Sequence, residues 1–167
     1  MVDVAQIGLV IAPEHARELA EAGIKIKDLL KDQVAVSHPL IPGPTEIAYV
    51  MFRDKDPDGA ILTCTTLKPG RVDRSPCGTG SSANLAVLHA RGQIQIGEQR
   101  LSKSIIGGTF TAQPIAETYV GPYKAVLPRI TGRAWIYGTE RLRLAPDDPF
   151  AQGFAMSDTW GPQVGNL

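Results

Sequence analysis

The sequence predicts an α+β fold in which an antiparallel sheet wraps one apolar helix. Residues 83–90 are apolar almost throughout, which is typical of a buried helix, and Gly92 stands where such a helix would stop. Short runs rich in strand-forming residues follow at close spacing, with glycines between them. No internal repeat or domain boundary interrupts the 167 residues, so we expect a single domain with one core.

The chain before the apolar helix is expected to begin with a strand, an amphipathic helix and a connector. Residues 1–10 mix aliphatic and polar side chains and are typical of a strand. A helix is predicted over residues 13–33, because Pro13 stands near its first position and apolar residues recur at helical spacing. Gly23 is the weak point of this helix. Prolines make residues 37–44 a connector.

A hairpin and a polar loop are predicted next. Residues 46–52 and 60–67 have strand composition, and the intervening residues 54–59 are rich in Asp, Pro and Gly, as turns are. Residues 71–82 are small and polar and lead into the apolar helix. Beyond Gly92, strands are predicted at residues 101–106, 109–118, 124–128, 134–137 and 141–144. Residues 146–167 are expected to be irregular.

Composition and charge exclude several classes of function. Lys+Arg and Asp+Glu number 17 each, so no basic excess points to nucleic acid or to an anionic membrane. No apolar run approaches the roughly 18 residues of a membrane span. The first residues do not resemble an export signal, so we expect a cytoplasmic protein. Its two cysteines, Cys64 and Cys77, are then expected to be reduced, although their number alone also allows a disulfide.

The residues around Cys77 suggest an amino-acid site. Cys77 stands where the polar loop passes into the apolar helix, and helix N-termini favour thiolates and bind anions through free N–H groups. Gly78 lets a ligand approach the backbone, and the Thr79 hydroxyl can cap the helix or bind an anion. Asp73 offers an acceptor for an ammonium group. A thiol between these groups could exchange the α-proton of an amino acid without pyridoxal phosphate or a metal, so no cofactor is expected.

Other interpretations of the same residues remain open. A cysteine beside a glycine-rich helix start can be a small structural residue. A phosphate loop would need a Gly-Lys-Ser/Thr ending, and the spacing of a dinucleotide fingerprint is also absent. No cluster has metal-ligand spacing, and no Ser-His-Asp signature is present. We interpret Cys64 as a half-buried strand residue and His89 as a partner of the dipole at the helix C-terminus.

Several motifs resemble one known family. The octapeptide DRSPCGTG at residues 73–80, continued by SSANLA and by LHARG at residues 88–92, resembles the second-cysteine motif of the proline racemase family. That family includes 4-hydroxyproline 2-epimerases and trans-3-hydroxyproline dehydratases. Further landmarks stand in family order, namely SIIG at residues 104–107 with Phe110, ITGRAWI at 130–136, DDPF at 147–150 and GF at 153–154.

The resemblance implies a fold and a mechanism. It implies a lobe of the diaminopimelate epimerase type, with an antiparallel β-sheet or barrel around a central helix, and residues 1–167 correspond to the second of two such lobes. Two cysteines on opposite faces of a proline or 4-hydroxyproline then exchange its α-proton. By resemblance Cys77 is the second of these cysteines, and Asp73, Gly78 and Thr79 bind the imino acid. Neither metal nor cofactor is implied.

One departure from the family pattern is large. The first-cysteine motif, of the Met-Cys-Gly-His type, does not occur in this sequence. The chain could be a truncated product, one isolated half, or a subunit of a split enzyme, and a non-catalytic remnant is the alternative. We expect it to need a first-cysteine lobe or to self-associate, and we expect no racemisation by the chain alone.

The resemblance also discriminates between branches of the family. The dehydratases have threonine at the position of Cys77, so cysteine favours the racemase or epimerase branch. Leu67 lies where an aromatic side chain lines the pocket of proline racemases, and a smaller residue there favours 4-hydroxyproline over proline. Isomerases of the same architecture that act on diaminopimelate or methylaconitate have different residues around the cysteine.

Overall fold

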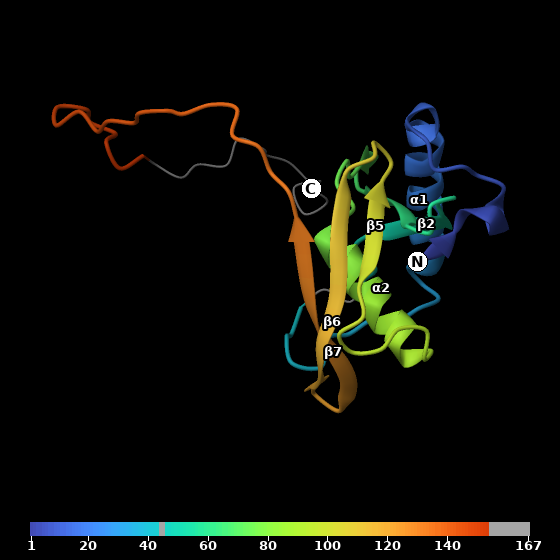
Figure 1. The fold of residues 1–167 in the computed structure, drawn as a ribbon. Helices are drawn as coiled ribbons and strands as arrows, with labels where there is room; N and C mark the ends of the chain where they lie inside the picture. Colours follow the sequence, from blue (N-terminus) through green and yellow to red (C-terminus); the bar gives the residue numbers. More distant parts are fainter. Residues whose placement is uncertain (44–45, 154–167) are drawn as a thin grey trace. The chain divides into compact units, whose positions relative to one another are not determined.

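The computed structural model describes residues 1–43 and 46–153 (Figure 1). Residues up to Arg133 form one compact unit, and the described residues of a second unit, 134–153, contain no helix or strand. In the first unit the chain forms two α-helices, α1 (Ala16–Leu30) and α2 (Gly78–Ala90). Its strands are β1 (Val2–Asp3), β2 (Val50–Lys55), β3 (Ile61–Leu67), β4 (Arg71–Val72), β5 (Arg100–Ser104), β6 (Thr109–Val120) and β7 (Tyr123–Gly132). Short 3-10 turns lie at Val4–Ile7 and Pro13–His15.

The strands form one mixed, open sheet. Their order is β1-β2-β3-β5-β6-β7, and β4 pairs with β3. β1 runs parallel to β2, and β3 runs parallel to β5, whereas the other pairs are antiparallel. The expectation of an antiparallel sheet or barrel is therefore wrong in two respects: two of the pairs are parallel, and the sheet does not close into a barrel. The connection from β3 to β5 passes through α2, and such a crossover brings the second strand back parallel to the first.

Helix α1 packs against β2 and β3 through its buried residues Leu19, Ala20 and Gly23. Its start agrees with the prediction, because the Pro13–His15 turn leads directly into the helix. A side chain at Gly23 would collide with the Oγ1 atom of Thr66 on β3. The glycine that looked like a weak point is therefore a place where the helix approaches the sheet closely.

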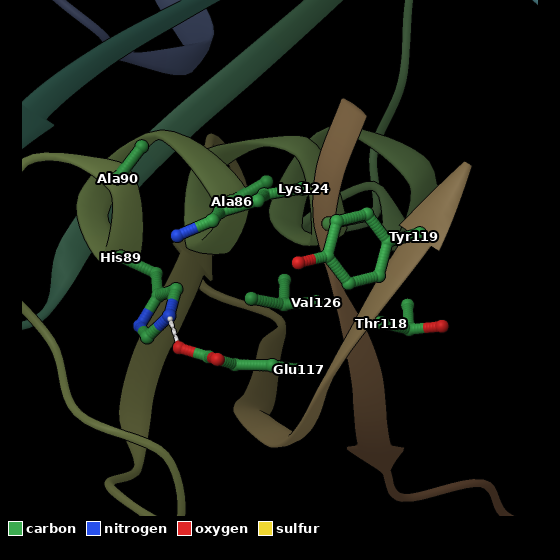
Figure 2. A pocket seen from close by; sticks show the side chains of 9 residues that line it. Ala86, His89, Ala90, Glu117, Thr118, Tyr119, Lys124 and Val126 are labelled. Atoms are coloured by element: carbon green, nitrogen blue, oxygen red, sulfur yellow. Dashed lines mark hydrogen bonds and ion pairs between the residues drawn. The ribbon is translucent and has the colours of Figure 1, made fainter. Parts of the chain in front are cut away.

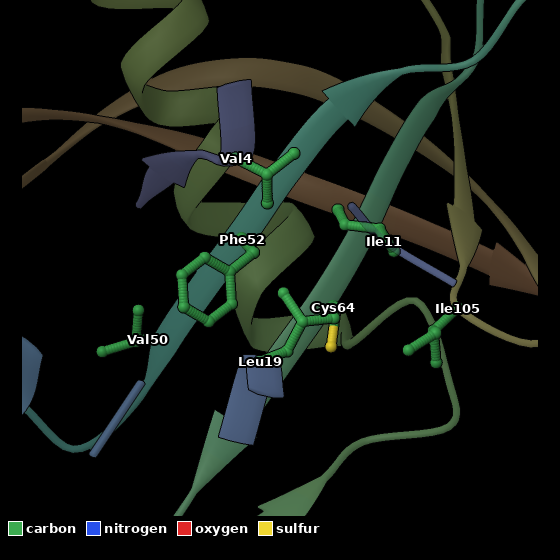
Figure 3. Close-up of a cluster of buried hydrophobic side chains, with 7 residues drawn as sticks. All are labelled: Val4, Ile11, Leu19, Val50, Phe52, Cys64 and Ile105. Carbon is green, nitrogen blue, oxygen red and sulfur yellow. The ribbon is translucent and has the colours of Figure 1, made fainter. Parts of the chain in front are cut away.

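The main core lies between α1, the N-terminal segment and the sheet (Figure 3). Its buried members are Val4, Ile11, Leu19, Val50, Phe52, Cys64 and Ile105. Phe52 is fully buried, and burying a side chain of this size contributes about 1.5–3 kcal/mol. Cys64 is 0% exposed, and burial, followed by the charge of Asp73, raises the pKa of its thiol to about 12.

Helix α2 lies across β6 and β7 and shares a second core cluster with them. Leu85, Ile94 and Ala112 are the buried members of that cluster. The helix begins at Gly78, five residues earlier than its apolar stretch indicated, and the predicted glycine stop is confirmed: Gly92 has φ 67° and its N–H donates to the carbonyl of His89. Ala83 and Ala90 are exposed, so the described sheet covers one side of α2 and does not enclose it.

Two predicted strands are absent and one was missed. Residues 134–137 and 141–144 are not strands, and Ile136 and Tyr137 are 92% and 102% exposed. Their β-forming composition is insufficient, because a strand needs a partner to pair with. Two-residue β4 was not predicted, and residues 1–10 contain only the short β1 before turning into a 3-10 helix. Residues 146–153 of the predicted irregular tail contain no helix or strand, and the part of that prediction from Phe154 on lies outside the described residues.

The one predicted hairpin is recovered with shifted ends, and the strands predicted at residues 109–118 and 124–128 form a second hairpin. β2 and β3 pair around a turn in which Gly59 has φ 86°, which a glycine adopts without strain. β6 and β7 are longer than predicted and pair down to a tight turn at Gly121. Neither helix in the described part of the chain has the length and apolar character that crossing a bilayer requires.

A cavity of about 370 Å³ is lined by residues from the second half of α2 and from the β6–β7 hairpin (Figure 2). His89 lies in the last turn of α2, as predicted, but its ring bonds elsewhere: Nε2 lies 2.9 Å from Glu117 Oε1, and Nδ1 lies 3.1 Å from the Ile94 carbonyl oxygen. The hydrogen bond to Glu117 and that to the Ile94 carbonyl raise the pKa of His89 above its ordinary value of 6.5. The pair joins the hairpin to the helix.

This pair predicts a pH dependence of stability. Because the pKa of His89 is higher in the folded state, its contribution is complete below the ordinary value and is lost as the pH rises through the folded value. Urea titrations from about pH 5 to about pH 8 should show the free energy of unfolding falling, and Glu117→Gln should reduce that slope. Glu21→Gln, which removes an exposed carboxylate paired with Arg17, is the matched control. An unaltered slope in Glu117→Gln would contradict the assignment.

Candidate active site

A short polar loop, tied to β3, delivers the chain to the start of α2. The Asp73 N–H donates to the carbonyl of Thr65 on β3 at 2.8 Å. The Ser75 N–H then donates to Asp73 Oδ1 at 2.8 Å, and the Cys77 N–H donates to Ser75 Oγ at 3.0 Å. Each of the last two bonds joins a side chain to the backbone two residues on, which is how Asp and Ser build turns.

The residue before the cysteine is anchored more firmly. Pro76 is fully buried, and its carbonyl accepts the hydroxyl of Ser81 at 3.1 Å and that of Thr63 at 3.4 Å. Thr63 belongs to β3 and Ser81 to the first turn of α2. The backbone immediately before Cys77 is therefore bonded to both the sheet and the helix.

Cys77 is the N-cap of α2 and has φ 61° and ψ 105°. Among the residues that the structure describes it is the only non-glycine residue with positive φ, a conformation that costs on the order of 1–3 kcal/mol. Its Sγ accepts the N–H of Gly80 at 3.3 Å, and its carbonyl accepts the N–H of Ser81 at 2.8 Å. The thiol thus takes the capping position that a hydroxyl or carboxylate usually holds.

Two backbone donors remain at this helix start. The first turn of a helix leaves its N–H groups without intrahelical acceptors, and that of Gly80 is used by the cysteine. The N–H groups of Gly78 and Thr79 have no acceptor in the described part of the chain. A side chain added at Gly78 would meet no described atom within 4 Å, and Thr79 is exposed. Both donors are therefore available to an external anion such as a carboxylate.

The four predicted site residues are brought together. Cys77, Gly78 and Thr79 are consecutive at the start of α2, and Asp73 is joined to them through Ser75. One carboxylate oxygen of Asp73 already accepts a bond within the loop, which the sequence interpretation did not foresee. Both cysteines are free thiols, and Cys77 is partly exposed whereas Cys64 is buried. Cys64 is even more buried than the half-buried strand residue that we expected.

Other residues that shape the site were missed. Ser75 and Pro76 stand inside the recognised octapeptide, and the turn-forming character of Ser75 is a signal that could have identified it. Met51, on β2, is 4% exposed and lies against Gly80. No sequence pattern connects Met51 with the helix, because the two are neighbours only in the folded chain.

Leu67 lies at the end of β3, and the described residues contain no metal-binding cluster. Leu67 ends β3 and lines a small hollow beside α1 that is also lined by Gly23 and Ile24. Its predicted influence on substrate choice stays a prediction. In the described ranges, no three His, Cys, Asp or Glu side chains lie close enough together to hold a metal ion.

Comparison with known proteins identifies close relatives. The chain is 53% identical over 167 residues to a 4-hydroxyproline 2-epimerase of Rhizobium rhizogenes, and 52% identical over 167 residues to one of Agrobacterium fabrum. Each match covers 100% of this chain and 48% of the relative. The chain therefore spans about half the length of these curated relatives.

The chain is also similar to two solved structures, which are named as a racemase and an epimerase. A probable proline racemase from Agrobacterium radiobacter K84, with bound carbonate, superposes with a TM-score of 0.79 at 53% identity and covers 99% of this chain and 49% of that one. A hydroxyproline epimerase from Agrobacterium vitis, with bound trans-4-hydroxy-L-proline, has a TM-score of 0.79 at 52% identity, with coverages of 99% and 48%. Residues 1–155 match the proline racemase family. The chain belongs to the proline racemase family.

Proposed function

We propose that this chain is one lobe of a cofactor-independent 4-hydroxyproline 2-epimerase, in which Cys77 is one of two thiols that exchange the α-proton. The observation that carries the proposal is the start of α2, where the partly exposed Cys77 thiol stands beside the N–H groups of Gly78 and Thr79, which meet no acceptor among the described residues. The relatives named 4-hydroxyproline 2-epimerase, and the related epimerase that binds trans-4-hydroxy-L-proline, support this substrate over proline.

The proposed binding mode follows from the chemistry of these groups. The N–H groups of Gly78 and Thr79 donate to the substrate carboxylate, and the carboxylate of Asp73 accepts from the ring ammonium. This arrangement directs the α-carbon towards Cys77 Sγ. Asp73 can accept a further bond while Oδ1 keeps its bond to the Ser75 N–H, because each carboxylate oxygen has two lone pairs.

The proposed reaction is a proton exchange without net change in composition. A thiolate on one face removes the α-proton and becomes a thiol, and the electron pair of the broken C–H bond spreads onto the carboxylate. The N–H donors at the helix start stabilise the negative charge that develops there. A thiol on the opposite face then gives its proton to the α-carbon, which inverts the configuration. Cys77 acts as the base in one direction and as the acid in the other.

The second thiol is proposed to come from another lobe. Cys64 cannot supply it, because it is 0% exposed within the core. Residues 1–167 would thus act as one lobe of a two-lobe enzyme, paired with a first-cysteine lobe or with another chain. Analytical ultracentrifugation of the chain with and without such a lobe would show whether they associate.

The central test is reconstitution. We expect the purified chain alone to convert no trans-4-hydroxy-L-proline, because one thiol serves one face only. Adding the part of the Rhizobium rhizogenes relative that this chain does not match should produce epimerisation, measured by polarimetry. Cys77→Ser should reduce the reconstituted rate by about a hundredfold or more, and Cys64→Ala is the matched control. Substantial conversion by the chain alone would refute the two-thiol proposal.

The two cysteines should differ in reactivity towards iodoacetamide. At about pH 8 we expect mass spectrometry to find Cys77 alkylated and Cys64 unmodified, because only thiolates react and Cys64 is buried with its pKa raised to about 12. Both should react in urea. Equal alkylation rates in the folded chain would contradict the different environments assigned to the two thiols.

Asp73→Asn separates the two roles of that side chain. Asparagine keeps an oxygen that can accept the Ser75 N–H, so the loop should stay folded, but it removes the charge that would pair with the substrate ammonium. In the reconstituted enzyme we expect KM for 4-hydroxyproline to rise roughly tenfold or more. Asp73→Ala, which removes both functions, should be worse. A KM unchanged by Asp73→Asn would exclude the ammonium contact.

A further inference from the structure

Gly80, the third residue of α2, borders a small space that is also reached by two sulfur-containing side chains. A Cβ atom built at Gly80 would collide with Met51 Cε, and would lie 3.1 Å from Met51 Sδ and 3.2 Å from Cys77 Sγ. Met51 reaches this place from β2, and Cys77 reaches it from the helix cap. The thioether of Met51 and the thiol of Cys77 therefore both border the space that a side chain at residue 80 would occupy.

Backbone conformation does not explain a glycine here. Gly80 is not one of the residues with positive φ in the described chain, and alanine is favoured over glycine inside a helix. Several other glycines of the chain, among them Gly59 and Gly92, do have positive φ. What requires a glycine at position 80 is the space beside it. The N–H of the same residue donates to Cys77 Sγ at 3.3 Å.

We propose that Gly80 and Met51 are positioning residues for the Cys77 thiol. Gly80 leaves the space in which the sulfur lies within reach of an N–H donor, and Met51 closes that space from the sheet side. Met51 is only 4% exposed, so packing holds it in place, whereas Cys77 is partly exposed. A side chain added at Gly80 would collide with the end of the buried Met51 side chain and would also press on the Cys77 sulfur at 3.2 Å. Because the sulfur is partly exposed, it can move outward from its N–H donor.

The catalytic importance of this contact rests on the proposed function, but the position of the sulfur can be tested without substrate. Gly80→Ala should slow the alkylation of Cys77 by iodoacetamide by about fivefold, because the displaced sulfur loses its hydrogen bond from the Gly80 N–H. Adding Met51→Ala in the same chain makes room for the new methyl group and should restore the rate to within about twofold. Gly138→Ala is the control for the glycine-to-alanine change, because a side chain there meets no described atom within 4 Å.

Urea titration of each variant shows whether it is folded. A folded Gly80→Ala that is alkylated at the original rate, or a folded double variant that does not recover, overturns the proposal. If Gly80→Ala does not fold, Met51→Ala alone decides: a slower Cys77 supports the positioning role, and an unchanged rate overturns it.

A second readout separates this proposal from the proposed function. In the reconstituted enzyme Gly80→Ala should lower kcat and leave KM for 4-hydroxyproline nearly unchanged, because the N–H groups of Gly78 and Thr79 are untouched. A purely structural role would lower stability without this split. If the alkylation results hold but no variant, including the original chain, reconstitutes epimerisation, only the proposed function fails.

Discussion

The position of Cys77 depends on the anchoring of the Pro76 carbonyl. Pro76 is buried, and its oxygen accepts one hydroxyl from β3 and one from the first turn of α2. Without these bonds the loop between β4 and α2 would keep the Asp73 N–H bond to Thr65 but would lose its anchor directly before the helix. With them, the last peptide before the helix has a fixed place on the sheet, and the direction in which the cysteine leaves the backbone is set.

The same anchoring offsets the conformation of the cap. A non-glycine residue with φ 61° costs on the order of 1–3 kcal/mol. The Asp73 and Ser75 N–H groups, the Cys77 N–H and the Ser81 hydroxyl each form a bond in this region, and such a bond contributes about 0.5–1.5 kcal/mol. Their sum is comparable with the cost. The hydrogen bonds of the loop therefore offset the cost of the backbone conformation that Cys77 adopts.

The sequence predicted the local features of the site better than the arrangement of the sheet. The glycine stop at Gly92 and the cysteine at a helix start depend on residues close together in the chain, and both are confirmed. The parallel pairing of β3 with β5 could not be predicted, because it follows from the path of α2 across the sheet. The false strand at residues 134–137 has strand-forming composition but is not one of the strands of the described sheet. Met51 was missed for a related reason, since only the register of β2 brings it to Gly80.

The two cysteines show how position in the fold decides which thiol a ligand can reach. The sequence contains two cysteines, and Cys64 is closed in the core, where burial and the charge of Asp73 raise its pKa to about 12. A thiol in that state can neither reach a substrate nor ionise near neutral pH. Cys77 is thus the one cysteine that can meet a ligand. If inversion at the α-carbon uses a thiol on each face, the opposite thiol must belong to a partner surface. In that proposed reaction, the start of α2 supplies the N–H donors and one of the two acid/base groups, all on one face of the substrate.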